Sequence, residues 1–251
     1  LPLYLKLAFE QARSWGPTDS PAGLPTDIDG MIESMLKALE EDHTPSKITE
    51  AIDGWGSKAP LVHKASLVET ALGLLQAARH GLAETELLDA LSQDREFIEA
   101  YKQTLHHTLP EDRLPIAAWS RLYLDLAPYL VEREAQGVVV LGFFHRQVGE
   151  VIGRRYGEGT AGQRSHARLA AYFGGLENFL DAGRQQPNGR KLAELPYQQL
   201  QSEQWEALEQ TLIDFDLLMA TCQAEMQRQL VGDYRDAWKR LQTAGQLDIQ
   251  A

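Results

Sequence analysis

The sequence predicts a mainly α-helical protein with one short β segment near its middle. Along most of the chain, apolar residues recur at alternating spacings of three and four, as they do on one face of an α-helix. The exception lies between Gly137 and Phe144, where β-branched and large apolar residues follow one another without a gap. Such a run, preceded by a glycine-containing turn, is typical of a buried strand.

The helical spacing is first clear between Leu61 and Leu75. The residues that carry it are Leu61, Ala65, Val68, Leu72 and Leu75. Gly81 favours a helix end, because glycine readily adopts the left-handed turn that follows one. Before the strand the pattern predicts further helices at Glu84–Leu91, Phe97–His106 and Ile116–Glu132.

Helical spacing returns after the strand and continues to the C-terminal region. A first stretch carries Val148, Val151, Ile152 and Tyr156. The longest repeat runs from Trp205 to Met226 and predicts one helix of about six turns with one side buried. A last helix is predicted from Leu230 to Leu241. We interpret Trp119, Trp205 and Trp238 as core anchors, and residues 13–27 and 181–189 as linkers.

Between Leu61 and Tyr156 the predicted order is a series of helices, the second of them short, then the strand and a further helix. Helices followed by a strand-built wing are the arrangement of a winged-helix domain. The candidate recognition helix, Ile116–Glu132, offers Arg121 and is followed by Arg133, against Asp125, Glu132 and Glu134. A helix that reads DNA needs donors for bases and phosphates, so a DNA-binding regulator is the less favoured interpretation.

The composition is that of a folded acidic protein. Hydrophobic residues make up 43% and charged residues 24% of 251 residues, and the formal net charge is -12. This charge disfavours nucleic acid and anionic membranes as partners, and no apolar run approaches the roughly 20 residues of a transmembrane helix. Cys222 is the only cysteine, which suits a reducing cytoplasm. Because the chain begins with Leu1 rather than Met, we expect it to be part of a longer protein.

The motifs of common catalytic sites are absent from the sequence. There is no G-x-x-x-x-G-K-[ST] phosphate loop, and the glycine clusters at 54–58 and 157–162 lack its spacing. The adjacent His106 and His107 point about 100° apart on a helix, which makes a poor metal clamp. We therefore expect neither a catalytic nor a metal site, and no ATP hydrolysis by this chain alone.

Three stretches carry a family resemblance. Leu1–Leu5 (LPLYL) resembles the motif that follows the nucleotide-binding core in STAND-class signalling ATPases of the NACHT and NB-ARC type. Residues 141–152 (LGFFHRQVGEVI) resemble their winged-helix strand and following helix, with a histidine at the junction. Residues 190–218, with the later GDYRDAW, are similar to helical segments of NACHT proteins related to telomerase-associated and nephrocystin-like proteins.

The resemblance implies a domain organisation. Residues 1–56 would be the remnant of a helical domain that follows a nucleotide-binding core. Residues 57–160 would be the winged-helix domain with its small β wing, and residues 161–251 a solenoid-like helical arm. The implied partners are the upstream nucleotide-binding domain, a downstream sensor domain and, in the active state, further copies of the protein.

The resemblance also implies a nucleotide contact. His145 would touch the β-phosphate of ADP, Pro2 would pack near the base, and Arg146 stands where plant members have aspartate. The cofactor, ADP or ATP, would be shared with the upstream domain. Residue-level alternatives remain for each position: a polar helix start for His145, a first-turn proline for Pro2 and a solvated helix face for Arg146.

We therefore expect a regulatory module that couples nucleotide state to conformational switching and oligomerisation in signalling or defence. The alternative is an interaction scaffold whose histidine never meets nucleotide.

Overall fold

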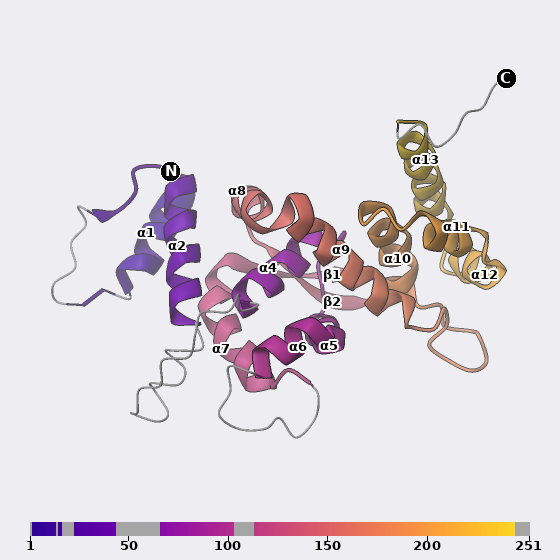
Figure 1. Cartoon of the computed structure of the whole chain (residues 1–251), viewed down its shortest axis with the longest axis horizontal. Helices are drawn as coiled ribbons and strands as arrows, with labels where there is room; N and C mark the ends of the chain where they lie inside the picture. The colour runs from indigo at the N-terminus through magenta and orange to yellow at the C-terminus, as the bar shows by residue number, and fades with distance from the viewer. Residues whose placement is uncertain (1, 14, 17–22, 44–65, 103–112, 244–251) are drawn as a thin grey trace.

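The computed structural model describes residues 2–13, 15–16, 23–43, 66–102 and 113–243. Within these ranges the protein is mainly helical, with a single two-stranded antiparallel sheet (Figure 1). The helices before the sheet are α1 (Pro2–Arg13), α2 (Ile28–Asp42), α4 (Leu67–Ala77), α5 (Glu84–Gln93), α6 (Arg95–Lys102) and α7 (Ile116–Leu126), followed by the 3₁₀ turn η2 (Ala127–Tyr129).

The sheet is a hairpin of β1 (Leu130–Ala135) and β2 (Val138–Phe143). After it come α8 (Arg146–Ile152), a π-helical turn η3 (Gly153–Gly157), α9 (Gly159–Gly174), α10 (Gly189–Gln201), α11 (Trp205–Ile213), α12 (Phe215–Gln223) and α13 (Gln227–Thr243). In Figure 1 the α1–α2 pair lies at one end, α4–α9 with the hairpin in the middle, and α10–α13 at the other end.

A continuous apolar core joins these parts. It includes Leu7 of α1, Leu36 of α2, Trp119 of α7, Phe173 of α9 and Leu217 of α12, each at most 2% exposed. The expected divisions at 56/57 and 160/161 remain predictions, the first lying outside the described residues. Elements from all three expected units nevertheless share one core.

Side-chain caps explain why several helices begin where they do. The Asp27 carboxylate accepts from the Gly30 amide at 2.7 Å at the start of α2. At the start of α10 the Asn188 side chain accepts from the Lys191 amide at 3.2 Å. Each cap satisfies a backbone N–H that the helix leaves unpaired, which stabilises the helix by about 1 kcal/mol.

The hairpin turns tightly at Gln136 and Gly137. Both residues have positive φ, 50° and 76°, as the twist of a two-residue hairpin requires. The turn fixes the register, with Ala135 opposite Val138 and Leu130 opposite Phe143. On its other edge β2 pairs with the α4–α5 loop, because Leu141 and Leu82 exchange backbone hydrogen bonds of 3.1 and 2.7 Å. The hairpin is thereby fastened to the helical core.

The predicted helix Ile116–Glu132 is too long. Helix α7 ends at Leu126, and residues 130–135 form a strand that the sequence interpretation missed. Pro128 explains the end, since proline lacks an N–H and its ring clashes with the preceding helical turn. Trp119 does anchor the core, with 0% exposure.

The run from Gly137 to Phe144 does form a strand, β2, but only part of it is buried. Val140 and Leu141 are buried, whereas Val138 is 38% and Val139 59% exposed. The half of β2 nearest the turn projects beyond the core with the tip of the hairpin, so its apolar residues meet solvent.

The predicted single helix from Trp205 to Met226 is wrong. Asp214, in extended backbone, separates α11 from α12, and its carboxylate caps α12 by accepting from the Asp216 amide at 3.0 Å. The apolar spacing continues across the break, but Phe215 is 71% and Met219 47% exposed. Trp238 is 45% exposed, so it is not a core anchor.

Other predicted helices are confirmed where the structure describes them. Helices α4, α5, α6 and α13 coincide with the predicted segments, although residues 61–65 and 103–106 lie outside the described residues. The helices and the hairpin follow one another as a winged helix requires, but the winged-helix assignment itself stays a prediction. Among the described residues, no helix has both the length and the hydropathy needed to cross a bilayer.

Candidate functional site: the strand–helix junction and the polar seam

His145 lies between the end of β2 and the first residue of α8. Its backbone is extended (φ -137°, ψ 138°), and its Nδ1 accepts a hydrogen bond from the Gln147 amide at 3.2 Å, which makes it the N-cap of α8. An accepting Nδ1 carries no proton, so the proton of the neutral ring sits on Nε2. The half-buried imidazole therefore has an Nε2–H to offer to a ligand.

The cap also limits what the helix start can donate. The Gln147 amide is used by the His145 ring, and the amides of Val148 and Gly149 bond to the His145 carbonyl at 3.1 and 3.4 Å. An anion at this junction would therefore be bound mainly by side chains rather than by a row of backbone amides.

Arg146 extends into solvent from the first turn of α8. Its side chain is 87% exposed, and its Nε lies 3.2 Å from a carboxylate oxygen of Glu150, four residues on. Such an exposed pair contributes at most about 0.5 kcal/mol, so the guanidinium is easily redirected to another anion.

Pro2 is the first residue of α1 and is exposed. One turn further on, the Lys6 ammonium lies 3.9 Å from the centre of the Phe144 ring, and that ring is 5.9 Å from the ring of His145. The beginning of α1 is thus packed beside the junction. His145 and Arg146 therefore lie at one edge with Lys6, and Pro2 precedes Lys6 by about 6 Å of helix rise.

Cationic groups surround this edge, which we call the junction edge (Pro2, Lys6, Arg133, His145 and Arg146). From β1 the Arg133 guanidinium reaches the Phe143 carbonyl at 3.5 Å. Sequence interpretation missed Lys6 and Arg133. The only available signal for Lys6 was its position one helical turn after Pro2. In a chain of net charge -12, a local gathering of donors favours an anionic ligand here.

Arg154 and Arg155 of η3 both pair with carboxylates of α2. Arg155 binds Glu33 at 2.7 Å and Glu40 at 2.6 Å, and Arg154 binds Asp29 at 2.5 Å. Burial and the hydrogen bond to Glu40 raise the pKa of the Tyr156 hydroxyl above its usual value. These contacts fasten α2 to η3.

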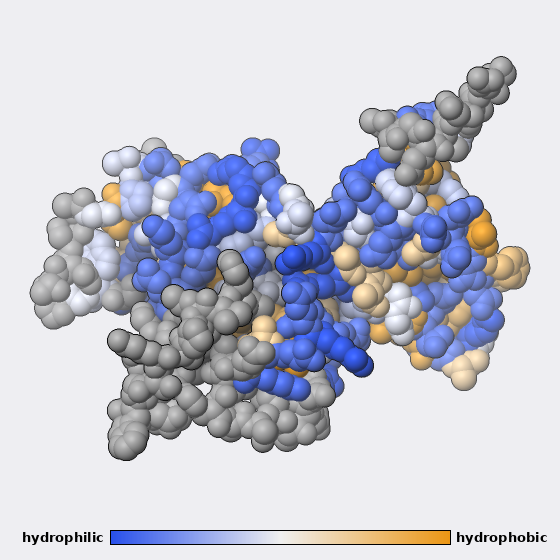
Figure 2. Space-filling view, viewed as in Figure 1, coloured by the Kyte–Doolittle hydropathy of each residue, from blue (hydrophilic) through white to orange (hydrophobic). Residues whose placement is uncertain are grey.

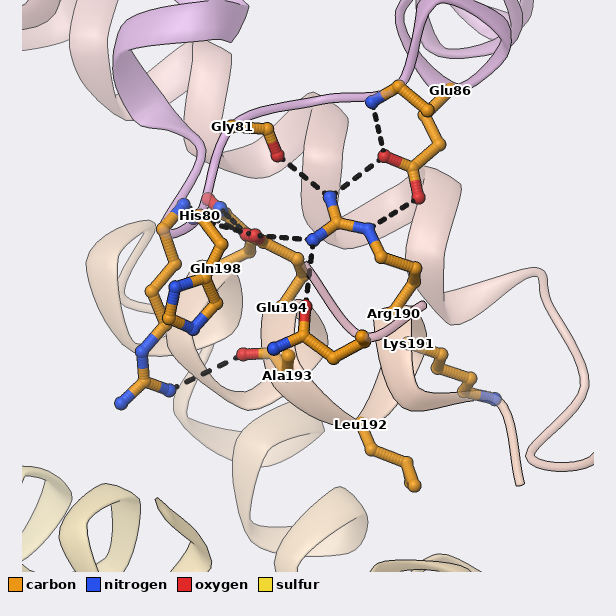
Figure 3. A network of polar contacts seen from close by, with 12 residues as sticks. His80, Gly81, Glu86, Arg190, Lys191, Leu192, Ala193, Glu194 and Gln198 are labelled. Carbon is orange, nitrogen blue, oxygen red and sulfur yellow. Dashed lines mark hydrogen bonds and ion pairs between the residues drawn. The ribbon is translucent and has the colours of Figure 1, made fainter. Parts of the chain in front are cut away.

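A buried polar network joins the middle of the molecule to α10 (Figure 3). The Arg190 guanidinium makes two hydrogen bonds of 2.8 Å to the Glu86 carboxylate and one of 2.7 Å to the Gly81 carbonyl. It also reaches the Gln136 side chain at the hairpin turn, at 3.2 Å. Both charged side chains are under 10% exposed. One residue of α10 thus holds both the α4–α5 loop and the tip of the hairpin.

Glu194 continues the network one turn along α10. Its carboxylate, 0% exposed, accepts from the backbone amides of Arg79 and His80, both at 3.0 Å, and from the Gln198 side chain at 2.8 Å. Burial lowers the pKa of His80, although the Glu194 carboxylate acts in the opposite direction.

Arg79 extends the network to α13. Its guanidinium donates to Asp233 at 2.7 Å and lies 5.3 Å from the centre of the Tyr197 ring. Burial raises the pKa of Asp233 to about 6, with Arg79 only partly offsetting the effect. We call the set Arg79, Glu86, Arg190, Glu194 and Asp233 the polar seam.

The junction edge and the polar seam are connected by the hairpin. His145 follows the end of β2, and Gln136 lies just before its beginning; the six-residue strand between them, Val138–Phe143, is about 17 Å long. The seam could not be predicted from the sequence, because its partners are 104 residues apart and charged residues are usually exposed.

Comparison with known proteins identifies relatives but not a matching fold. The chain is 31% identical over 235 residues to human NACHT domain- and WD repeat-containing protein 1, an alignment that covers 83% of this chain and 14% of that protein. It is 34% identical over 172 residues to the mouse protein of the same name, covering 68% and 10%. Human NACHT and WD repeat domain-containing protein 2 is 27% identical over 179 residues, covering 70% and 9%.

The chain therefore spans only a small part of the relatives that it matches. No family model matches the chain, and no solved structure matches it.

Proposed function

Because this chain is a NACHT-related protein, homologous to part of the NACHT and WD repeat-containing proteins, we propose that it is the regulatory segment of a STAND-type ATPase. It couples the ADP or ATP state of a nucleotide-binding domain to the position of the α10–α13 arm. In this proposal the segment supplies no catalytic group, and the nucleotide is shared with the nucleotide-binding domain. A domain of WD repeats, for which the relatives are named, is the proposed sensor.

The observation that carries the proposal is the connection from His145 to Arg190. A change at the junction edge displaces β2, and β2 cannot move alone because Leu141 is paired with Leu82 and Gln136 with Arg190. The buried Glu86–Arg190 pair holds α10 to the same loop. Such a rigid connection is what a ligand-biased two-state element requires.

The donors of the junction edge suit a nucleotide phosphate. His145 offers Nε2–H, and Lys6, Arg133 and Arg146 supply positive charge from three different elements. When bound, the nucleotide would supply negative charge that differs between ADP and ATP. One charge-assisted hydrogen bond contributes about 1.5–3 kcal/mol. A contact made only in the ADP state would therefore change ADP retention by roughly 10- to 100-fold.

The test separates the ring of His145 from its cap. The full-length protein, including its proposed nucleotide-binding domain, is purified as wild type and as the variants His145→Ala, His145→Ser and Arg146→Ala. The ADP that remains bound to each protein is measured after dialysis. Serine caps helices well but offers no imidazole N–H. The proposal predicts that the Ala and Ser variants lose ADP alike, by roughly 10-fold or more, with a smaller loss for Arg146→Ala.

Two results would oppose this proposal. If His145→Ser retains ADP like wild type while His145→Ala does not, the histidine acts only as a cap. If all variants retain ADP and assemble like wild type, the chain is an interaction scaffold that does not contact nucleotide.

A further inference from the structure

The outer end of the arm carries a groove that the proposed switch does not use. It lies between α11 and α13 and has a volume of about 440 Å³. Its apolar lining includes Leu208, Leu212 and Ile213 from α11 and Tyr234, Trp238 and Leu241 from α13. Figure 2 shows apolar residues gathered on this lobe, whereas the opposite part of the visible face is mainly hydrophilic.

We propose that this groove is a docking site for an amphipathic helix of a partner protein, with lysine or arginine flanking its apolar stripe. The lining residues of α13 recur at spacings of three and four, so they form one stripe along the helix. The apolar residues of α11 form the other wall, and a groove with two apolar helical walls can receive a third helix. From Tyr234 to Leu241 the wall is about 10 Å long, enough for two helical turns.

The groove is preformed. The Tyr234 hydroxyl of α13 donates to the Leu212 carbonyl of α11 and fixes the two walls relative to each other. Arg240 of α13 donates to the Leu200 carbonyl of α10 at 3.3 Å. A preformed site binds more tightly, because less conformational freedom is lost on binding.

The core under the groove is thin and uncovered on one side. Its buried members, separate from the main core, are Leu200, Leu208, Leu212 and Ala237. Ile213 remains 67%, Tyr234 41% and Trp238 45% exposed above them. An exposed apolar patch of this kind marks an interaction surface.

The charges of the lining select the occupant. Glu206 and Glu209 are the charged residues that line the groove. They favour basic flanks on a docking helix. A second copy of this chain is disfavoured, since two facing grooves would bring four of these glutamates together and each chain carries a net charge of -12.

The test uses two synthetic peptides of 14 residues with the same leucine stripe, one flanked by lysine and the other by glutamate. Binding to the whole chain is measured by fluorescence anisotropy of the labelled peptides. The lysine peptide should bind roughly 10-fold more tightly than the glutamate peptide, which is the difference that two partly exposed ion pairs provide. The affinity of the lysine peptide should fall as the salt concentration rises. Trp238→Ala should weaken that binding at least about 10-fold.

Charge reversal supplies the matched control. Glu206→Lys/Glu209→Lys should invert the preference, whereas Glu132→Lys/Glu134→Lys, an equal change on the exposed face of β1, should leave it unchanged. Equal affinity for both peptides overturns the proposal. So does the absence of binding at a peptide concentration of about 100 μM, roughly 100 times the Kd of a typical micromolar interaction. Self-association that Trp238→Ala abolishes, measured by sedimentation, would assign the groove to a second copy instead and also overturns it.

Discussion

Single residues decide how firmly the arm is held. Arg190 and Glu86 form a bidentate pair in a region almost without solvent, and each has further backbone partners. In contrast, Arg146 and Glu150 pair in full contact with water. A buried charge whose partner is removed is far more costly than an exposed one, so these two pairs should respond very differently to truncation.

We predict that Glu86→Ala lowers the free energy of unfolding by about 3 kcal/mol, because the buried Arg190 guanidinium loses its bidentate partner and keeps only the longer 3.6 Å contact to Glu194. Arg146→Ala should change it by less than about 0.5 kcal/mol. Urea denaturation followed by circular dichroism measures both. A cost below about 1 kcal/mol for Glu86→Ala would show that the seam opens to water easily, which contradicts its role in holding the arm.

Asp233 predicts a pH dependence of stability. Burial raises its pKa in the folded protein from 3.8 to about 6, and its Oδ2 has no hydrogen-bond partner among the described residues. The folded state therefore binds more protons than the unfolded state between about pH 4 and pH 6. Stability from this group is fully present below pH 4 and is lost as pH rises through 6.

Asp233→Asn removes this titration. The stability of wild type relative to Asp233→Asn should fall by about 2–3 kcal/mol between pH 4 and pH 7, the equivalent of the two-unit shift. Urea denaturation of both proteins across this range provides the measurement. A difference that is constant or that rises with pH would show that the Arg79 ion pair outweighs the effect of burial.

At the scale of elements, the sequence predicted what local spacing determines. Helix α5 and helix α13 followed from apolar periodicity, and β2 from its run of valines. Strand β1 was missed because Leu-Val-Glu-Arg-Glu-Ala contains good helix formers, and its pairing with β2 is not visible in its own residues. The break at Asp214 was hidden because the apolar spacing continues across it.

The candidate functional site also has one part that local sequence patterns predict and another that they do not. The position of His145 at a strand–helix junction could be predicted from local patterns and a family resemblance, and the structure places it there. The approach of Lys6 and the Arg190 network depend on contacts between distant segments. A single sequence carries no record of such contacts.

Gly81 tests how closely the hairpin is fastened to the core. Its φ is +88°, and an added Cβ would lie 2.3 Å from the Leu141 carbonyl oxygen. Gly81→Ala should therefore destabilise the fold by roughly 2 kcal/mol or more, from backbone strain and displacement of β2. Gly142 lies in β2 itself, and an added Cβ there would meet nothing within 4 Å. Gly142→Ala should therefore have little effect on stability. Thermal unfolding compares them, and equal effects would mean that β2 is loosely held.

For the molecule as a whole, continuous packing and the polar seam lead to one expectation. The core runs from α1 to α12, Arg155 fastens α2 to η3, and Arg190 fastens α10 to the hairpin. The described part of the chain should therefore move as one rigid body against the nucleotide-binding domain. If the arm were hinged instead, α10–α13 would move relative to the hairpin.

The most direct test measures that rigidity in both nucleotide states of the full-length protein. Cys222 is exposed on α12, Val139→Cys adds a second labelling position on the hairpin, and cysteines outside this chain are replaced by serine. Double electron–electron resonance gives the distance between the labels with ADP and with ATP. We predict an unchanged distance, together with a changed distance from Cys222 to a label on the nucleotide-binding domain. A distance between Cys222 and residue 139 that changes with nucleotide would contradict the account.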